Sequence, residues 1–286
     1  MSRGVGIAIA IAACGPARVP RVPLPALEAA RDDIDDRAPI DPYGPDLETH
    51  GFVGDHIPSD ASLGDPGAIV ELSVRVDHAS TGEQHRLDIH VGPGAPVGIA
   101  EREAALRTTA EYDAEDPAIE RAAREATAVV RDDRDRVAAL VAYVYGHVQY
   151  EHADERIASV VLARGRGDCS EMSLLFIALA RAVHVPARRV VGLAATYVDG
   201  APAFGLHAWA EVALDGRWQP VDPTWNEPIA DATHVPLHVG DGDVWARDLD
   251  DLELAVLSYE RDEALDGRAD IRRLVDELPD RLRALR

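Results

Sequence analysis

Hydrophobic residues recur at helical spacing in residues 165–193 and predict an amphipathic helix there. Asp168 can cap the first turn of this helix, and Glu171, three residues later, completes a capping box. The predicted helix therefore begins at Cys169 and continues until Pro186 interrupts it. One face is expected to be buried, because apolar side chains repeat every three or four residues at Met172, Leu175, Phe176, Leu179 and Val183.

Beyond this helix the hydrophobic period changes from 3.6 residues to two, which predicts strands. Residues 188–193 form the first of these alternating stretches. Two more, residues 206–214 and 217–225, flank Asp215-Gly216, a dipeptide that is typical of two-residue hairpin turns. A β-hairpin is therefore expected downstream of the helix.

The predicted turn also sets which residues of the hairpin face each other. If Leu214 pairs with Arg217, Trp209 lies opposite Asp222, and His207 lies two residues away on the same face of the sheet. Such diagonal neighbours are roughly 7 to 8 Å apart, a gap that an imidazole and a carboxylate can bridge by reaching toward each other. The register therefore predicts a couple between His207 and Asp222.

Upstream of the cysteine, residues 116–150 contain two helical segments that divide near residues 131–135. Their apolar positions should pack behind the cysteine helix, namely Val137, Leu140, Val141, Val144 and Val148. Residues 68–76 alternate between apolar and polar side chains, and residues 87–91 repeat that alternation, so a small β unit should precede the core. A further strand is expected around residues 252–258.

The first fourteen residues resemble a short secretion signal. Arg3 supplies a charged start, residues 5–13 an apolar run, and Ile11-Ala12-Ala13-Cys14 resembles the lipobox of bacterial lipoproteins, in which the cysteine is acylated. This predicts a lipid anchor at Cys14 and a lipid-anchored or periplasmic location in the cell envelope. The alternative is an unstructured apolar start on a cytoplasmic protein, because the run is short for a signal.

These patterns divide the chain into five parts. The expected parts are a lipoprotein signal at 1–14, a Pro-, Asp- and Gly-rich linker at 15–66, the small β unit at 67–100, the core at 101–260 and a C-terminal helix at 261–286.

Charge and composition narrow the class of partner. The 286 residues carry a formal net charge of −22, with acidic side chains spread throughout, which argues against nucleic acid as a partner. All 29 basic residues are arginine, so the protein cannot offer a lysine amine to a crosslink. The two cysteines could form a disulfide, but Cys14 has its own explanation in the lipobox and Cys169 in chemistry.

A cysteine at a helix start suits nucleophilic chemistry. The positive pole of the helix is expected to make the Cys169 thiol easier to ionise. A nucleophilic thiol also needs a base, and the base needs a third group that orients it, roles that His207 and Asp222 can fill. A cysteine on a helix followed by His and Asp on adjacent antiparallel strands is the arrangement of papain-like folds.

Two stretches, GDCSEMSLLFIALARAVHVPARRVVGL and HAWAEVALDGRWQPVDPTW, resemble the core of the transglutaminase-like superfamily, and the resemblance covers about residues 101 to 240. It implies an α+β, papain-like fold in which the cysteine helix packs on an antiparallel sheet that bears His and Asp. It also implies Cys169 as nucleophile, His207 as base and Asp222 as orienting residue, with Trp209 beside the histidine. His184 stands where the family more usually has glycine.

The expected function is thiol-dependent acyl transfer without a cofactor, acting on a peptide or protein substrate of the envelope. Hydrolysis of a peptide or amide bond is favoured over transglutaminase-type transfer to an amine, because nothing in the sequence would exclude water. The rival from another class is a non-catalytic envelope binding module, in which His207 is a core histidine and Asp222 only begins a turn.

Other candidates have bland explanations in the sequence. His234 and His238 have the spacing of a helical metal pair, but Pro236 lies between them, so no metal site is expected.

The backbone N–H of Cys169 is the expected oxyanion donor, and Gln149 or Tyr150 could supply a second one.

Overall fold

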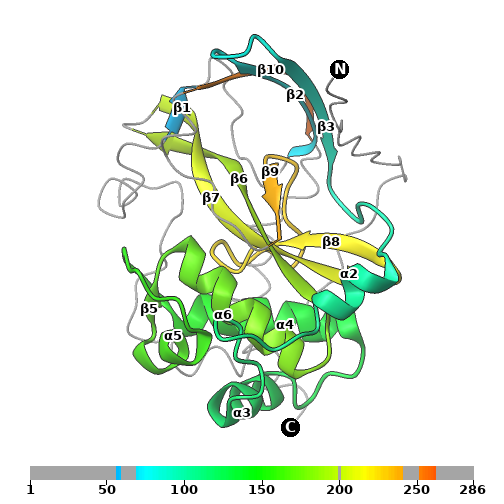
Figure 1. Cartoon of the computed structure of the whole chain (residues 1–286), viewed down its shortest axis with the longest axis vertical. Coiled ribbons are helices and arrows are strands. Elements are labelled where there is room, and N and C mark those ends of the chain that lie inside the picture. Colours follow the sequence, from blue (N-terminus) through cyan, green and yellow to red (C-terminus); the bar gives the residue numbers. More distant parts are fainter. Residues whose placement is uncertain (1–55, 59–68, 199–200, 241–250, 262–286) are drawn as a thin grey trace, which may run out of the picture.

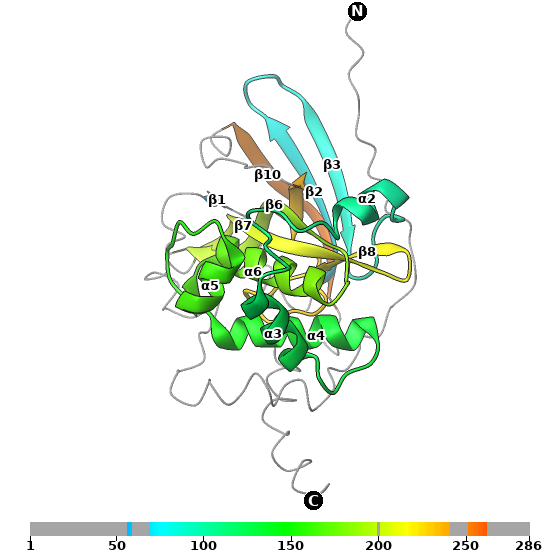
Figure 2. The same cartoon turned by 60° about the horizontal axis from the view of Figure 1, so that its bottom comes forward.

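The protein has three layers in the computed structural model, which describes residues 56–58, 69–198, 201–240 and 251–261. A five-stranded antiparallel sheet lies between a group of helices and a smaller three-stranded sheet (Figures 1 and 2). The predicted α+β class, with a cysteine helix packed on an antiparallel sheet, is confirmed. The predicted signal, all of the predicted linker except 56–58, and all of the predicted C-terminal helix except residue 261 lie outside the described residues.

The helical layer is built around the cysteine helix. Its members are α3 (Pro117–Ala126), α4 (Asp133–His147), α5 (Ala158–Arg164) and α6 (Cys169–Ala182). The short helix α2 (Ile99–Ala104) lies apart from them, beside β8 (Figure 2). The two helical segments predicted in residues 116–150 are α3 and α4, and the five apolar positions named above are all buried. They pack against α6 in one hydrophobic cluster, as predicted.

The cysteine helix begins as predicted but is more buried than expected. Asp168 accepts a hydrogen bond from the backbone N–H of Ser170 at 2.8 Å, and Glu171 accepts one from the N–H of Asp168 at 2.9 Å. Nearly every residue from Glu171 to Arg181 is buried, rather than one face alone. The reason is that α3, α4 and α5 cover the sides of α6 that the sheet does not.

The central sheet contains the predicted hairpin. Its strands run in the order β1-β7-β6-β9, with β8 also paired to β7, and they are β1 (His56–Pro58), β6 (Ala187–Val198), β7 (Ala201–Leu214), β8 (Arg217–Val221) and β9 (Val235–Val239). Asp215 and Gly216 have φ values of 52° and 74°, as a type I′ turn requires. Leu214 pairs with Arg217, so the predicted register is confirmed.

The smaller sheet joins segments that are distant in sequence. It has the order β10-β2-β3, with β2 (Ile69–His78), β3 (Gln84–His90) and β10 (Leu252–Arg261). The strand expected around residues 252–258 is therefore present, but its pairing with β2 was not predicted. Two short parallel strands, β4 (Gln149–Tyr150) and β5 (Arg166–Gly167), were not predicted either.

The long strands β6 and β7 serve two hydrophobic clusters. Near the hairpin turn, Ala210 and Val212 pack with the helices. Toward the other end of the strands, Leu193 and Phe204 pack with the apolar face of β2. His207 therefore lies on β7 between the two clusters.

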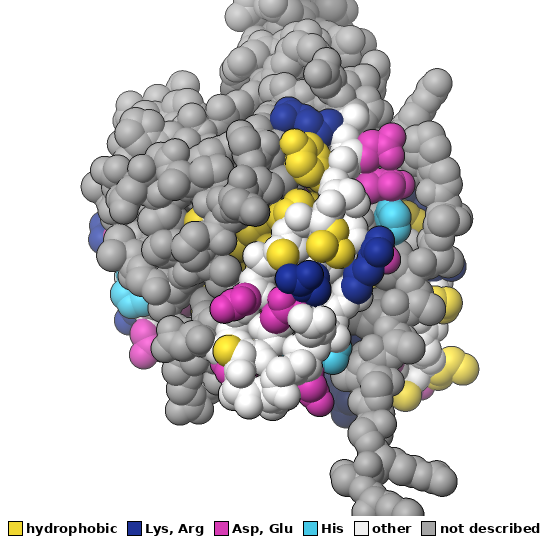
Figure 3. All heavy atoms as spheres, turned by 90° about the horizontal axis from the view of Figure 1, so that it is seen from above, with side chains coloured by type: hydrophobic (Ala, Val, Ile, Leu, Met, Phe, Trp, Pro, Cys, Tyr) yellow, Lys and Arg dark blue, Asp and Glu magenta, His cyan; other side chains and the backbone are white. Residues whose placement is uncertain are grey.

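Charges on the described surface are interspersed. On β2 and β3, Arg75 pairs with Asp77 and Arg86 with Asp88 along the same strand. The described part of the face in Figure 3 likewise shows arginine and acidic side chains close together. In the described part of the chain, no helix has the length and apolar character that crossing a bilayer would require.

Gly192 of β6 allows the closest approach in the central sheet. A Cβ on this residue would lie 2.1 Å from the Val235 carbonyl oxygen of β9 and 2.8 Å from the ring of Trp209. We expect Gly192→Ala to lower the free energy of unfolding by about 3 kcal/mol, since β9 and the tryptophan must both move. Urea denaturation measures this change. Gly94→Ala is the matched control, because its Cβ would make only an ordinary 3.4 Å contact, and a similar loss there would contradict the explanation.

His184 follows the cysteine helix in a left-handed conformation, with φ of 62°. A residue with a Cβ is strained there, and glycine is not. Because the side chain of His184 is exposed, little packing is lost on its removal. We expect His184→Gly to raise the free energy of unfolding by about 0.5 to 1 kcal/mol, measured by urea denaturation, whereas His184→Ala should bring no gain.

Candidate active site

His207 and Asp222 form a buried hydrogen-bonded pair. His207 comes from β7 and Asp222 from the residue that follows β8, and their side chains are fully buried. The Nε2–H of His207 donates to Oδ2 of Asp222 at 2.7 Å, because a carboxylate can only accept. The backbone N–H of Thr224 donates to Oδ1 of Asp222 at 2.7 Å. Asp222 thus both begins a turn and holds the histidine, so the predicted geometry of this couple is confirmed.

Two tryptophans hold the plane of the His207 ring. The ring of Trp225 stacks on it with 4.3 Å between centroids and 11° between planes. Trp209 lies on the same strand, with its ring centroid 6.1 Å away. The packing of Trp209 beside the histidine was predicted, whereas the stacking of Trp225 was not. Both rings restrict rotation of the imidazole and exclude water from its bond to Asp222.

Cys169 lies against β7 beside this pair. The backbone N–H of Ala208, the residue after His207, donates to the Cys169 thiol, and the Ser173 hydroxyl donates to the Ala208 carbonyl oxygen at 3.0 Å. This edge of β7 is accessible to α6 because β1 pairs with residues 203–205 and β8 with residues 210–214. The strand therefore connects the thiol to the histidine through one peptide unit.

The electrostatic environment of the thiol differs from the expectation. Burial raises the pKa of the Cys169 thiol, and the carboxylate of Asp168 raises it further. The N–H of Ala208 and the Arg189 guanidinium act in the opposite direction but do not outweigh these effects. The expectation that the helix start makes this half-buried thiol easier to ionise is therefore wrong for the thiol by itself. Cys169 is a free cysteine and needs a base to take its proton.

Asp222 retains its charge despite complete burial. Burial acts to raise the pKa of this carboxyl, but the charge of His207 and the hydrogen bonds from His207 and His234 hold it well below its ordinary value. Asp222 is therefore an anion at neutral pH. An anionic Asp222 keeps the proton of the neutral His207 ring on Nε2, so that Nδ1, on the opposite side of the ring, is the basic nitrogen.

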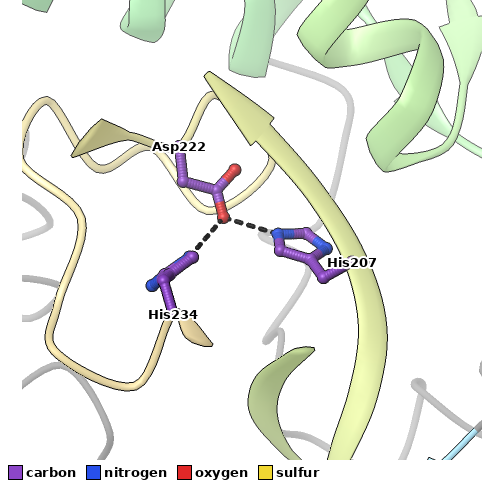
Figure 4. A group of neighbouring side chains, drawn as sticks. All are labelled: His207, Asp222 and His234. Carbon is purple, nitrogen blue, oxygen red and sulfur yellow. Dashed lines mark hydrogen bonds and ion pairs between the residues drawn. The ribbon is translucent and has the colours of Figure 1, made fainter. Parts of the chain in front are cut away.

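His234 joins the pair as a further buried histidine. Its Nε2–H donates to Asp222 Oδ2 at 3.1 Å, so one carboxylate oxygen bridges two imidazoles (Figure 4). It does not lie on a helix with His238, because it immediately precedes β9 and His238 pairs with Val191 within that strand. In the sequence, His234 stands out only by its spacing from His238, which does not predict a metal site because Pro236 lies between them. Only the pairing of β9 with β6 brings it to Asp222.

Two groups of side chains here are close enough to hold a cation. One is His207, Asp222 and His234, and the other is Glu227, Asp231 and His234, each with its ligand atoms within 4.8 Å of one another. Nε2 of His207 and Nε2 of His234 make hydrogen bonds to Asp222, and Nδ1 of His234 makes one to the Asp231 carbonyl oxygen. We therefore interpret the group as a hydrogen-bonded network.

The two candidates for a second oxyanion donor are separated by the structure. Gln149 is exposed, whereas Tyr150 is partly buried and pairs with Gly167, two residues before Cys169. Burial raises the pKa of the Tyr150 phenol above its ordinary value, and the charges of Cys169 and Asp168 add to this. The Tyr150 phenol therefore remains protonated, and its strand pairs with the residues that lead into α6.

Two glutamates flank this region without forming part of it. Glu211 accepts hydrogen bonds from Arg188. Glu171 accepts from the backbone N–H groups of Asp168 and Glu155, so it ties the loop before α5 to the start of α6. Burial raises the pKa of Glu171 to about 7.

Two solved structures are similar to this chain. A candidate cysteine protease from Cytophaga hutchinsonii is 19% identical with a TM-score of 0.47, and the match covers 62% of this chain and 66% of that one, just under two thirds. The periplasmic domain of TgpA from Pseudomonas aeruginosa is 12% identical with a TM-score of 0.42, covering 72% of this chain and 93% of that domain. A comparison with curated protein sequences found no match.

A family model identifies the middle of the chain. The transglutaminase-like superfamily matches residues 120–223, a range that extends from α3 to the turn after β8 and contains Cys169, His207 and Asp222. This agrees with the resemblance noted in the sequence and with the α+β architecture. The similarity to this superfamily therefore extends over residues 120–223.

Proposed function

We propose that the protein is a thiol-dependent acyl-transfer enzyme that uses Cys169 as nucleophile, His207 as base and Asp222 as orienting residue. The observation that carries this proposal is the buried hydrogen bond between His207 and Asp222. His207 lies on β7, and the next residue of that strand, Ala208, donates a hydrogen bond from its backbone N–H to the Cys169 thiol. The family of residues 120–223 supports the same chemistry. The favoured reaction is hydrolysis of a peptide or amide bond.

Activation of the thiol begins the reaction. Because the environment of Cys169 disfavours a lone thiolate, the proton must be transferred to a neighbouring base as the sulfur attacks. His207 would take this proton on Nδ1, while Asp222 stabilises the imidazolium through Nε2–H. The charge pair that forms between thiolate and imidazolium compensates the cost of burying either charge alone.

Acylation of Cys169 and hydrolysis of the resulting thioester are the remaining steps. The sulfur attacks the amide carbonyl carbon, and the tetrahedral intermediate collapses as His207 returns its proton to the leaving amine, which leaves a thioester on Cys169. Water, deprotonated by His207, then attacks the thioester, and the carboxylic acid leaves as the thiol recovers its proton. An amine in place of water would give the transglutaminase-type product.

The oxyanion of each intermediate needs donors already in place. The backbone N–H of Cys169 is one, since it lies at the start of α6 and has no partner within the helix. The hydroxyl of Tyr150 is proposed as the second, on the support of the β4–β5 pairing that brings it near the thiol.

The substrate and the location remain proposals from the sequence. We propose a peptide or protein of the cell envelope as substrate and a lipid anchor at Cys14, on the strength of the lipobox-like start. A non-catalytic envelope binding module is the competing function, and the experiments below distinguish it.

The base role of His207 can be tested without knowing the substrate. In a Cys14→Ser background only Cys169 remains to react, so iodoacetamide labelling followed by mass spectrometry measures its reactivity. We expect His207→Gln to slow labelling at pH 7 by about tenfold or more, because the thiol loses the base that takes its proton. His238→Gln is the matched control and should label at the unchanged rate. Equal labelling with and without His207 would overturn this role.

The rival function is tested with the same Cys14→Ser protein. This protein and its Cys169→Ala variant are compared on a panel of peptides, isopeptides and glutamine donors, and turnover should disappear when Cys169 is replaced. Equal turnover in both proteins, together with retained binding of a panel member, would favour a binding module.

Tyr150→Phe should separate an oxyanion donor from a packed aromatic. Loss of one such donor typically costs about 10²-fold in kcat, so we expect a decrease of that order with KM nearly unchanged. Gln149→Ala, the exposed neighbour on the same strand, should leave kcat unchanged. Full activity of Tyr150→Phe would mean that the hydroxyl has no part in the reaction.

A further inference from the structure

His234 has acceptor groups on both sides of its ring. Nε2 lies 3.1 Å from the Asp222 carboxylate, and Nδ1 lies 3.2 Å from the Asp231 carbonyl oxygen and 3.3 Å from an oxygen of the Asp231 carboxylate. A carbonyl oxygen and an ionised carboxylate accept hydrogen bonds and cannot donate them. Both contacts are therefore satisfied together only if both ring nitrogens carry a proton, which makes His234 an imidazolium cation.

The burial of this group makes its charge state consequential. Asp222, Asp231 and His234 are all buried, and an unpaired charge in such a place would cost several kcal/mol. An imidazolium between the two carboxylates leaves less unbalanced charge than a neutral His234 ring would. The Asp231 carboxylate is itself held by the backbone N–H of Thr233 at 2.7 Å, so the acceptor side of His234 is fixed.

The charged groups around His234 come from several elements. Asp222, Glu227 and Asp231 belong to the segment between β8 and β9, and His207 faces the ring from β7 at 5.8 Å between centroids. On the other side of Asp222, the charge of this carboxylate raises the pKa of Cys169 of α6 and of Tyr150 of β4. Burial and the charge of the neighbouring Asp231 raise the pKa of Glu227 well above its ordinary value, while the charge of His234 acts to lower it.

These surroundings agree on the charge of His234. Burial acts to lower its pKa, yet the hydrogen bonds from the ring to Asp222 and Asp231 and the charges of Asp231 and Glu227 raise the pKa well above its ordinary value. The rings of Trp209 and Trp225 fill the remaining space, with their centroids 5.1 Å and 5.3 Å from that of His234.

We propose that His234 is a positioning residue of the active site, an imidazolium held between Asp222 and Asp231 that fixes the Asp222 carboxylate and limits the negative charge that Asp222 presents to His207. The consequence for catalysis rests on the proposed function of Cys169, His207 and Asp222. The hydrogen bonds from His207 and His234 to the same Asp222 oxygen do not depend on that function.

The effect on His207 has a definite sign. His234 shares Oδ2 of Asp222 with His207 and places a positive charge 5.8 Å from the His207 ring. Both features oppose a second positive charge on His207. The site therefore keeps His207 ready to accept the thiol proton and to return it, instead of holding that proton permanently.

Replacing His234 by glutamine tests this effect. His234→Gln keeps an N–H donor of similar reach toward Asp222 but removes the charge. In the Cys14→Ser background, the inflection of the labelling rate against pH that disappears in His207→Gln reports His207. We expect His234→Gln to move this inflection upward by about one to two pH units, because protonated His207 is no longer opposed by a neighbouring cation.

The control and the opposing results are distinct. His238→Gln, four residues further along the chain, should leave the inflection in place. A purely structural His234 would change stability or the overall rate without moving the inflection, and this result would overturn the proposal. A chain with no inflection that depends on His207 would instead overturn the proposed function.

A second measurement does not depend on activity. Nitrogen NMR of the full chain with ¹⁵N-labelled histidine should show one buried histidine with both ring nitrogens protonated at pH 7 and remaining so as the pH rises above neutrality. The resonance should disappear in His234→Gln and persist in His238→Gln. A His234 with a single protonated nitrogen, or with a nitrogen bound to a metal ion, would overturn the proposal.

Discussion

A single buried carboxylate, that of Asp222, imposes the strictest requirement on this structure. A charge with no exposure to water costs several kcal/mol unless it is neutralised and hydrogen-bonded. Here His207, His234 and the backbone N–H of Thr224 all donate to it. These donors come from β7, from the segment before β9 and from the turn after β8, so the carboxylate can be satisfied only when all of these segments are in place.

The fold meets this requirement by giving β6 and β7 two neighbours. The helices cover one end of the strands, and the small sheet covers the other. The polar network lies between two apolar clusters, where water is excluded and electrostatic interactions are strong. The thiol approaches from the edge of β7 that β1 and β8 leave accessible to α6. The sheet therefore positions His207 and the approach of the thiol, whereas Asp222 and His234 lie at the two ends of the segment that joins β8 to β9.

The site also shows how the environment of a group can oppose its local prediction. A helix start favours a thiolate, but burial and the capping carboxylate of Asp168 disfavour it more strongly at Cys169. The cap that defines the start of α6 thus disfavours ionisation of the thiol at the first residue of that helix. In the proposed reaction a neighbouring base removes this conflict, because proton transfer creates the opposite charge next to the thiolate.

Local patterns in the sequence determined much of this architecture. The cap at Asp168, the Asp215-Gly216 turn and the register of the hairpin depend on residues close together in the chain, and they sufficed to predict the pairing of His207 with Asp222. The same reasoning could not predict the position of Trp225 against His207, because the stacking depends on how the chain turns after β8.

Only the tertiary structure decided the rest. Pairing of β9 with β6 brings His234 to Asp222, pairing of β10 with β2 completes the small sheet, and packing of three helices buries α6 on all sides. None of these contacts leaves a periodic signal in the sequence, since each joins segments whose own patterns are complete without the other. The sequence by itself therefore determined the elements and one hydrogen-bonded pair, whereas the charge environment of that pair was decided by long-range packing.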